Sequence, residues 1–265
     1  MTLTAVVTGA NQGIGFEIAR AFAQRPGVRT VLTARNEERG AAAVQKIKAE
    51  SPSAELLVHQ LDITDEGSIK RFASWAGNEL KSIDVLCNNA GFAYHGNVFG
   101  AEEARTTIGV NYYGTVAITE ALKELVPPGG RIINICSVAG KLSILKTPEL
   151  RARFEQAASV KDLDALAEKF IDDVKAGRHT QEGWPTSMYG ISKLLESMYT
   201  RVLAQQLPKV MVNAVHPGYC STNMSSFRGP QPASDGADTP LWLAYLPQEQ
   251  WVSGKFFSNR REEPF

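Results

Sequence analysis

The chain has 265 residues, a length that suits one large or two small domains, and 43% of them are hydrophobic, enough for a sizeable buried core. Its 28 basic and 28 acidic residues cancel, which argues against a nucleic-acid-binding protein and against one that binds an anionic membrane surface. No run of residues reads as a signal peptide or a membrane span, and the three cysteines form neither a disulfide framework nor a metal-ligand spacing. We therefore expect a cytoplasmic protein with reduced thiols and no metal site.

Seven runs of apolar, largely β-branched residues predict strands, and helical patterns fit between them. Most of these runs are continuously apolar rather than alternating, which is typical of strands that helices cover on both faces. The alternation predicts an α/β, doubly wound Rossmann fold with a seven-stranded, mostly parallel sheet, in a single domain over residues 1–265. The predicted strands are Leu3–Thr8, Val28–Ala34, Glu55–Leu61, Ile83–Asn88, Arg131–Ser137, Val210–His216 and Gly254–Ser258, and the predicted helices lie near 14–25, 37–50, 65–80, 101–126 and 187–207.

A glycine-rich turn follows the first strand and opens the first helix. Its glycines allow a tight turn and the close approach of a pyrophosphate, and the helix N-terminus adds free N–H groups and the positive end of a dipole. Glycine also merely ends strands, so the turn alone is a weak signal; the strand–turn–helix context makes it a predicted dinucleotide site. The turn reads Thr8-Gly9-Ala10-Asn11-Gln12-Gly13-Ile14-Gly15.

The end of the second strand indicates which dinucleotide is bound. An NAD enzyme places an acidic residue about 20 residues beyond the glycines, to hold the ribose 2′-OH. Here the strand ends in Thr33-Ala34-Arg35, and Arg39 follows four residues later. A guanidinium suits a 2′-phosphate, so the pattern favours NADP, although Arg35 could also be an ordinary exposed loop charge.

The third and fourth strands end in polar residues. Asp62, followed by Ile63, could accept from the adenine amine or could equally start the next helix. Asn88-Asn89-Ala90-Gly91 closes the fourth strand and could line the cofactor's ribose, or could simply be a good tight turn.

Two further polar residues stand where a fold alone would not require them. Asn111 is a poor residue for the middle of a helix, which suggests a specific task for its amide, such as holding a water of a proton relay. Ser137 ends the fifth strand, at the sheet edge where doubly wound folds bind ligands, and its hydroxyl could bind a carbonyl oxygen. Without partners, the simpler interpretation of Ser137 is a strand-end serine that satisfies local backbone.

About fifty residues separate Ser137 from the next catalytic candidate, far more than one strand–helix step needs. The pair Thr147-Pro148 predicts a helix start, and Ser159 with Asp162 predicts a second one. Apolar residues then recur at helical spacing until Gly177, which could end that helix. We expect two inserted helices within residues 141–186, lying on the sheet domain rather than forming a domain of their own.

Tyr189 and Lys193 stand four residues apart on a predicted helix, so their side chains share one face. Reduction of a carbonyl needs a hydride and an acid that protonates the nascent alkoxide. A lysine about 4 Å away contributes up to about 4 kcal/mol to ionising a tyrosine, equivalent to about three pKa units, which would bring the phenol near neutral pH. As a bare pair, the two residues more often mark a solvated helix face.

Taken together, these motifs resemble the short-chain dehydrogenase/reductase family. The glycine turn, Asn88-Asn89-Ala90-Gly91, Asn111, Ser137, Tyr189 and Lys193 have that family's order and strand positions, and the resemblance spans nearly the whole chain. Within the family, the chain is similar to the monomeric NADPH-dependent carbonyl reductases in its inserted segment, Thr33-Ala34-Arg35, Glu182-Gly183-Trp184-Pro185 and Gly254-Lys255-Phe256-Phe257-Ser258.

The resemblance implies roles for these residues. Ser137, Tyr189 and Lys193 would form the catalytic triad, and Asn111 would support the proton relay. The inserted helices would cover a surface that other family members use to dimerise, which implies a monomer. The cofactor would be NADPH, held by Gly9, Asn11, Gln12, Gly13, Ile14, Gly15, Arg35, Arg39, Asp62, Ile63, Asn89, Ala90, Gly91, Tyr189, Lys193, Pro217, Gly218 and Thr222, with Asn11 and the two arginines at the 2′-phosphate, Asp62 at adenine, Asn89 at the ribose and the last three at the nicotinamide end.

The sequence departs from the family pattern at four places near the site. Gln12 stands where similar NADPH enzymes often have a basic residue, and Cys136 replaces a common second serine before Ser137. Ala139 replaces a bulkier side chain, and His216-Pro217-Gly218-Tyr219 replaces more familiar versions that contain Cys and Trp. These changes leave the expected chemistry intact and affect the substrate.

Aromatic and methionine side chains predict an apolar wall around the substrate. Ser137, Trp184, Tyr189 and Tyr219 are the expected substrate contacts; Phe92, Tyr94, Met224 and Phe227 could join them, and several of these residues could instead pack the substrate loop onto the core. Cys220 and Cys136 could be redox-sensitive, although buried inert thiols are the simpler interpretation.

Three functions fit the sequence. The favoured one is a broad NADPH-dependent reductase of aldehydes, ketones or quinones, a small-molecule enzyme without nucleic-acid or membrane partners. A dedicated reductase or dehydrogenase for one biosynthetic compound uses the same chemistry. A catalytically idle NADP-binding regulator is the third, and the intact Ser137, Tyr189 and Lys193 argue against it, because an idle site has no need of them.

Overall fold

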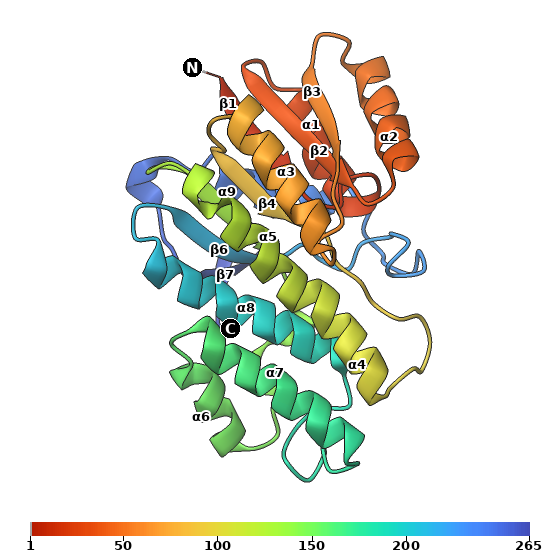
Figure 1. Cartoon of the computed structure of the whole chain (residues 1–265), viewed down its shortest axis with the longest axis vertical. Coiled ribbons are helices and arrows are strands. Elements are labelled where there is room, and N and C mark those ends of the chain that lie inside the picture. Colours follow the sequence, from red (N-terminus) through yellow and green to blue (C-terminus); the bar gives the residue numbers. More distant parts are fainter. Residues whose placement is uncertain (1) are drawn as a thin grey trace.

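The computed structural model describes residues 2–265, and at its centre lies one eight-stranded sheet with the strand order β3-β2-β1-β4-β5-β6-β7-β8 (Figure 1). All pairs from β3 to β7 are parallel, and β7 pairs with β8 antiparallel. The doubly wound α/β fold predicted from the sequence is therefore confirmed. The strands are β1 (Leu3–Val7), β2 (Val28–Ala34), β3 (Glu55–Gln60), β4 (Val85–Asn88), β5 (Arg131–Ile135), β6 (Met211–His216), β7 (Lys255–Ser258) and β8 (Arg261–Glu263).

The eighth strand is the one difference in the sheet, since the seven predicted strands all occur with ends displaced by two residues at most. β8 has only three residues, Arg-Glu-Glu, and so carries no apolar pattern that would mark it in the sequence. It returns along β7 through Asn259 and Arg260, whose φ angles of 49° and 58° are the left-handed geometry of a tight hairpin turn.

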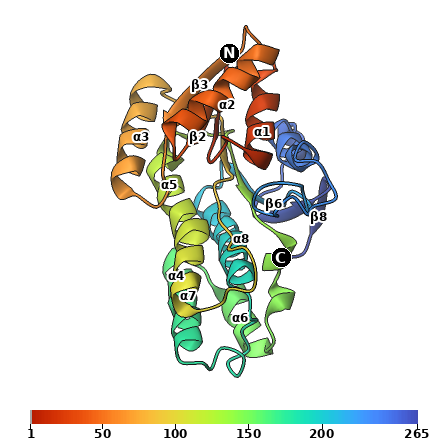
Figure 2. The same ribbon diagram turned by 90° about the vertical axis from the view of Figure 1, so that its right-hand side faces the viewer.

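Helices cover both faces of the sheet (Figure 2). Successive strand residues alternate between two apolar layers: Val6 belongs to the layer that contains α3, α5 and α8, and Val7 to the layer that contains α1, α2 and α9. This double cover explains why the strands are continuously apolar. The helices are α1 (Gly13–Ala23), α2 (Glu37–Glu50), α3 (Glu66–Glu79), α4 (Ala101–Ile108), α5 (Thr115–Leu122), α6 (Pro148–Gln156), α7 (Val160–Lys175), α8 (Met188–Gln206) and α9 (Asp238–Ala244).

The helix expected near 101–126 is interrupted in its middle. A π-helical segment, Gly109–Gly114, separates α4 from α5, and a 3-10 turn at Lys123–Leu125 ends the run. Asn111 lies inside the π segment and is completely buried. Such π turns widen the helix and occur frequently at functional sites. None of the helices in residues 2–265 is long and apolar enough to cross a membrane.

Two helices, α6 and α7, fill the stretch between Ser137 and Tyr189, and both start where the sequence indicates. The Thr147 hydroxyl accepts the N–H of Leu150 at 3.3 Å, and Ser159 with Asp162 forms a reciprocal capping box at the start of α7. α7 lies beside α4 and α8 (Figure 1). Its side chains Leu163, Leu166 and Phe170 belong to the core.

Candidate active site

The glycine turn and the turn after β4 interlock at the carboxyl edge of the sheet. Asn89 Nδ2 donates to the carbonyl oxygens of Thr8 and Gly9 at 2.9 and 3.2 Å, and the Thr8 hydroxyl accepts the N–H groups of Asn89 and Ala90 at 2.9 and 3.0 Å. A Cβ on Gly15 would lie 2.2 Å from Asn89 Nδ2, and one on Gly9 would lie 2.8 Å from Ala90 Cα. These glycines are therefore required by the close approach of the two turns.

This interlocking changes what Asn89 can do for a cofactor. Both of its amide hydrogens are directed at the glycine turn, so only Oδ1 remains to accept from a ribose hydroxyl. Ala90 and Gly91 continue the turn towards the catalytic residues: a Cβ on Gly91 would lie 3.3 Å from Asn111 Oδ1 and 3.6 Å from Lys193 Nζ. The two turns thus form a continuous floor from the first helix to the catalytic lysine.

The N-terminus of α1 opens onto this floor. Gln12 is the N-cap residue and makes no side-chain capping bond, so its side chain leaves the first N–H groups of the helix unsatisfied. Gly13 has a φ of 60°, which favours glycine, and Ile14 packs against Gly236. Thr222 lies 3.4 Å from a Cβ built on Gly13, so the loop after β6 reaches the glycine turn. An uncapped helix start beside glycine backbone suits a pyrophosphate.

Arg35 and Arg39 flank the start of α2 at the same edge, and both are exposed. The Asn36 side chain caps α2 by accepting the N–H of Arg39 at 2.8 Å, which fixes the backbone between the two arginines. Within residues 2–265, neither guanidinium has an ion-pair partner. Both are therefore free to meet an anion.

Asp62 is placed by a turn of its own, between β3 and α3. Its Oδ1 accepts from the N–H and the hydroxyl of Thr64 at 2.9 and 2.6 Å. Asp65, rather than Asp62, caps α3. The interpretation of Asp62 as the residue that starts the next helix is therefore wrong, because Asp65 has that role. Adenine binding by Asp62 and the buried Ile63 stays a prediction.

Ser137 and Tyr189 are brought together by direct backbone packing. Ser137 follows β5 and caps a 3-10 turn, Val138–Gly140, by accepting the N–H of Ala139 at 3.2 Å. A Cβ on Gly140 would lie 2.5 Å from the backbone nitrogen of Leu194, and one on Gly190 would lie 2.8 Å from the Ala139 carbonyl oxygen. The turn after β5 therefore rests on the first turns of α8, which brings the Ser137 hydroxyl close enough to the Tyr189 phenol to lower its pKa.

The electrostatics of Tyr189 differ from the sequence expectation. Burial raises the pKa of the phenol, Lys193 and the Ser137 hydrogen bond lower it, and Glu196 raises it; the net pKa lies above the ordinary value. The expectation that Lys193 brings the phenol near neutral pH is therefore wrong for the free protein. The reason is that burial removes water from the phenol and that the Glu196 carboxylate lies behind the lysine, and both effects oppose ionisation of Tyr189.

That carboxylate is the residue that sequence reasoning missed. Glu196 lies three residues after Lys193 on α8, and Lys193 Nζ donates to Glu196 Oε2 at 2.7 Å and to the carbonyl oxygen of Ile135 at 2.8 Å. Burial opposes the charge on Lys193, but Glu196, Tyr189 and Cys136 raise its pKa above the ordinary value. Burial likewise raises the pKa of Glu196, to about 7, against the lowering effect of Lys193. The available signal was the i, i+3 spacing to Lys193.

Asn111 bridges two segments of the site. Its Nδ2 donates to the Phe92 carbonyl oxygen and to the Ser192 hydroxyl, both at 2.9 Å, and its Oδ1 accepts the Phe92 N–H at 2.7 Å. The specific task inferred for the amide is thus to hold the loop after β4 against α8. These two bonds use both hydrogens of the Asn111 side-chain amide, so this amide does not donate to a water. A role for Asn111 in the proton relay through its other atoms stays a prediction.

Trp184 is a correction to the predicted substrate site. Its ring is 1% exposed, packs against Phe154 and Phe170, and donates from Nε1 to Asp173 Oδ2 at 2.8 Å. The tryptophan therefore closes the core of the inserted helices and does not face a substrate. Tyr219, the other aromatic substrate candidate, is 55% exposed on the loop after β6.

The remaining candidate wall residues belong to two loops that meet across the site entrance. Phe92 and Tyr94 pack edge to face in the loop after β4, while Met224 and Phe227 are exposed in the loop after β6. A contact of 2.9 Å between Ser226 Oγ and His95 Nδ1 joins the loops. Burial raises the pKa of Cys136 and of Cys220, which makes both thiols poor nucleophiles at neutral pH.

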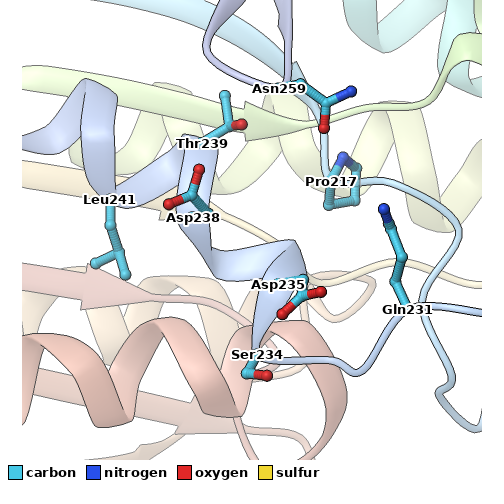
Figure 3. A pocket seen from close by; sticks show the side chains of 8 residues that line it. All are labelled: Pro217, Gln231, Ser234, Asp235, Asp238, Thr239, Leu241 and Asn259. Carbon is cyan, nitrogen blue, oxygen red and sulfur yellow. The ribbon is translucent and has the colours of Figure 1, made fainter.

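A cavity of about 460 Å³ lies beside the loop after β6 (Figure 3). Pro217 is the one predicted cofactor residue in its lining, and Ser137, Tyr189 and Lys193 do not line it. In the close view, Asp235 comes from the 3-10 turn that leads into α9 and Asp238 from the first residue of α9, and both lie opposite Gln231 and Asn259. Gln231 Oε1 lies 2.2 Å from a Cβ built on Gly218, so Gln231 packs under the Pro217-Gly218 turn.

Known proteins resemble this chain in sequence and in fold. A sequence model of the short chain dehydrogenases matches residues 3–148. Carbonyl reductase [NADPH] 1 of Mus musculus is 37% identical over 98% of this chain and 98% of its own. Salutaridine reductase from Papaver somniferum has a structure with a TM-score of 0.88 at 29% identity, covering 97% of this chain and 99% of that one. Menthone neomenthol reductase from Mentha piperita has a TM-score of 0.85 at 28% identity over the same shares.

Proposed function

Because the chain belongs to the short-chain dehydrogenase/reductase family and is related to the carbonyl reductases over almost its full length, we propose that it is an NADPH-dependent carbonyl reductase acting on aldehydes, ketones or quinones. The family membership confirms the resemblance seen in the sequence. The observation that carries the proposal is the packing of the turn that follows Ser137 against the first turns of α8, which carry Tyr189 and Lys193, at the edge where the glycine turn opens.

The residues at this edge fit a nicotinamide dinucleotide. Gly9 and Gly15 let the turn after β4 approach the glycine turn closely, and the uncapped start of α1 beside them offers N–H donors to a pyrophosphate. The cofactor, when bound, supplies the hydride. Arg35 and Arg39 support the choice of NADPH, because their unpaired guanidinium groups can bind a 2′-phosphate that an acidic residue would repel.

The chain's own residues would handle the proton. The Ser137 hydroxyl donates to the carbonyl oxygen of the substrate and holds it beside the Tyr189 phenol. Tyr189 donates its proton to that oxygen as the alkoxide forms, and Lys193 stabilises the resulting phenolate. The raised pKa of Tyr189 keeps the phenol protonated at neutral pH, which is the state that reduction requires.

The exposed wall formed by Tyr94, Tyr219, Met224 and Phe227 supports flat or bulky apolar substrates. A dedicated reductase for one biosynthetic compound is the second candidate. It is favoured by the two structural relatives described above, whose names each specify particular compounds, salutaridine in one and menthone in the other.

The inserted helices support a monomer. α7 covers α4 and α8 on the side away from the glycine turn, so an apolar helical face that would otherwise be open is buried within the chain (Figure 1). We include a monomeric, cytoplasmic enzyme in the proposal; sedimentation of the purified protein at micromolar concentration is its check, and a stable dimer would contradict it.

The experiment that tests the function is an assay of NADPH and NADH oxidation with quinones, aromatic aldehydes, aliphatic ketones and bulky polycyclic ketones. Turnover of several compounds with NADPH identifies a broad reductase, and a steep preference for one compound identifies the dedicated enzyme. Tyr189→Phe is the matched control: it should bind NADPH like the wild type while losing turnover by about 10²-fold or more, since it lacks only the acidic proton. Retained turnover in that variant would remove Tyr189 from the mechanism.

A further inference from the structure

Glu196 is a buried carboxylate that the chemistry described above does not use. It is 1% exposed in the middle of α8, and one of its oxygens, Oε2, accepts from Lys193 Nζ at 2.7 Å. The other oxygen, Oε1, is buried and has no hydrogen-bond partner among residues 2–265. An incompletely paired buried carboxylate is costly to the fold, so its presence next to the catalytic lysine calls for a reason.

The groups around Glu196 show what its charge can act on. Lys193 and Tyr189 precede it on α8, and Cys136 and the Ile135 carbonyl lie opposite, at the end of β5. Cys136 has its pKa raised by burial and is neutral at working pH, so Glu196 and Lys193 carry the local charge. Lys193 has three N–H donors, of which one points to Glu196 and one to Ile135. One donor is left for a phenolate or a ribose hydroxyl.

The pair therefore presents a reduced positive charge to the phenol. Lys193 alone would favour ionised Tyr189, and the ionised carboxylate of Glu196 opposes this effect from one helical turn further along. Burial raises the pKa of Glu196 to about 7, so the carboxylate is charged in the alkaline range where Tyr189 would lose its proton.

We propose that Glu196 is a positioning residue that holds Lys193 Nζ and offsets part of its charge, so that Tyr189 stays protonated and ready to donate. The inference rests on the proposed carbonyl reductase function and adds the direction that the site favours. A protonated phenol serves carbonyl reduction, and a phenolate serves alcohol oxidation. Glu196 thus extends the pH range of reduction upwards and confines oxidation to more alkaline conditions.

The decisive variant is Glu196→Gln, which keeps the shape and a hydrogen bond to Lys193 but removes the charge. The alkaline limb of kcat/KM for reduction and the acid limb for alcohol oxidation should both move to lower pH, by about one unit. Glu196→Asp is the matched control, which retains the charge on a side chain one methylene shorter. Its limbs should stay near those of the wild type, while kcat falls because Lys193 is held less well.

A second measurement does not depend on activity. The ionisation of Tyr189 in the protein without cofactor is followed by ultraviolet absorbance, with the Tyr189→Phe protein subtracted to remove the other six of the seven tyrosines. The midpoint should be lower in Glu196→Gln than in the wild type. A chain that reduces no carbonyl but shows this shift would contradict the proposed function and support the role of Glu196.

Coincident pH limbs and coincident phenol midpoints in the wild type and Glu196→Gln would overturn the proposal, since a purely structural carboxylate leaves both unchanged. Should Glu196→Gln not fold, carbon-13 NMR of the wild type labelled at glutamate carboxyls decides, with the Glu196 signal assigned from Glu196→Asp. An ionised carboxylate at pH 8 supports the proposal, and a carboxyl still protonated there overturns it.

Discussion

Two buried carboxylates, one in the inserted helices and one in the catalytic region, are held in opposite ways. Asp173 of α7 is completely buried and accepts from Lys169, Arg178 and the Trp184 indole, each at 2.8 Å. Burial alone would raise the pKa of Asp173, but these three hydrogen bonds lower it below its ordinary value. Glu196 has a single partner, and its pKa is raised. The difference teaches that the balance between the cost of burial and the number of hydrogen-bond donors decides whether a buried acid stabilises the fold or stays available to the chemistry.

The largest expected effect on stability comes from removing the Asp173 carboxylate, which accepts from three donors. Asp173→Ala removes three hydrogen bonds to a charged group and leaves the buried indole N–H without its partner, and should lower the free energy of unfolding by about 4 kcal/mol. Chemical denaturation measures this. The kcat of the folded fraction should remain close to that of the wild type, and a large loss of kcat with unchanged stability would erase the distinction between the two regions.

The pH dependence of stability sharpens the same comparison. The folded pKa of Glu196 lies above its ordinary 4.5, at about 7, so the folded protein binds more protons than the unfolded chain between these values. The stability contributed by this group is therefore present below pH 4.5 and lost as the pH rises towards 7, by about 3 kcal/mol at about 1.36 kcal/mol for each pKa unit. Asp173 has the opposite sign: its contribution is present above its ordinary 3.8 and lost as the pH falls through its lower folded pKa.

Denaturation curves of the wild type and Glu196→Gln from pH 4.5 to 7.5 give the measurement. The wild type should lose stability relative to the variant as the pH rises. Parallel curves would mean that Glu196 titrates alike in the folded and unfolded chains.

A smaller effect is expected at Trp184, which the sequence assigned to the substrate and the structure assigns to Asp173. Trp184→Phe keeps an aromatic ring in the core but removes the indole donor, and should cost about 2 kcal/mol, the range for a hydrogen bond to a charged group. Thermal unfolding reports the loss. KM values across the substrate panel should not change, whereas a selective rise in KM would return Trp184 to the substrate site.

The smallest effect on stability is expected at Arg35, which extends the comparison to a charge that has no ion-pair partner within residues 2–265. Arg35→Asp removes no packing or ion pair and should alter the free energy of unfolding by less than about 0.5 kcal/mol. The same change should shift the ratio of kcat/KM for NADPH over NADH towards NADH by at least about tenfold, because the new carboxylate repels a 2′-phosphate. An unchanged ratio would remove Arg35 from the cofactor site.

The sequence predicts those parts of the fold whose signal is local. Continuous apolar runs marked seven strands, and Thr147-Pro148 and the Ser159 capping box marked the starts of α6 and α7, because each pattern reports its own backbone. The short elements α9 and β8 escaped, since seven and three residues are too few for a period to show.

The same distinction applies to the site. Ser137, Tyr189 and Lys193 were predicted because strand ends and helix spacing place them. Trp184 was misplaced because its partner Asp173, eleven residues earlier, comes near it only when the chain folds back after α7. Glu196 was missed because its effect depends on how deeply one face of α8 is buried, which the sequence does not show. The same burial desolvates the Tyr189 phenol, and its pKa is therefore raised rather than lowered as expected.

The contact of Gly140 and Gly190 with the opposite backbone has a consequence for protein engineering. The chain leaves the catalytic edge at Gly140 and returns to it at Gly190, and at both points the two backbone segments touch. Residues 141–186 therefore form an inserted segment whose two ends lie side by side. The length and sequence of this segment can be exchanged without moving Ser137 relative to Tyr189, provided that its replacement again covers the apolar sides of α4 and α8. Exchange of this segment between related reductases should therefore leave the proton-transfer geometry in place.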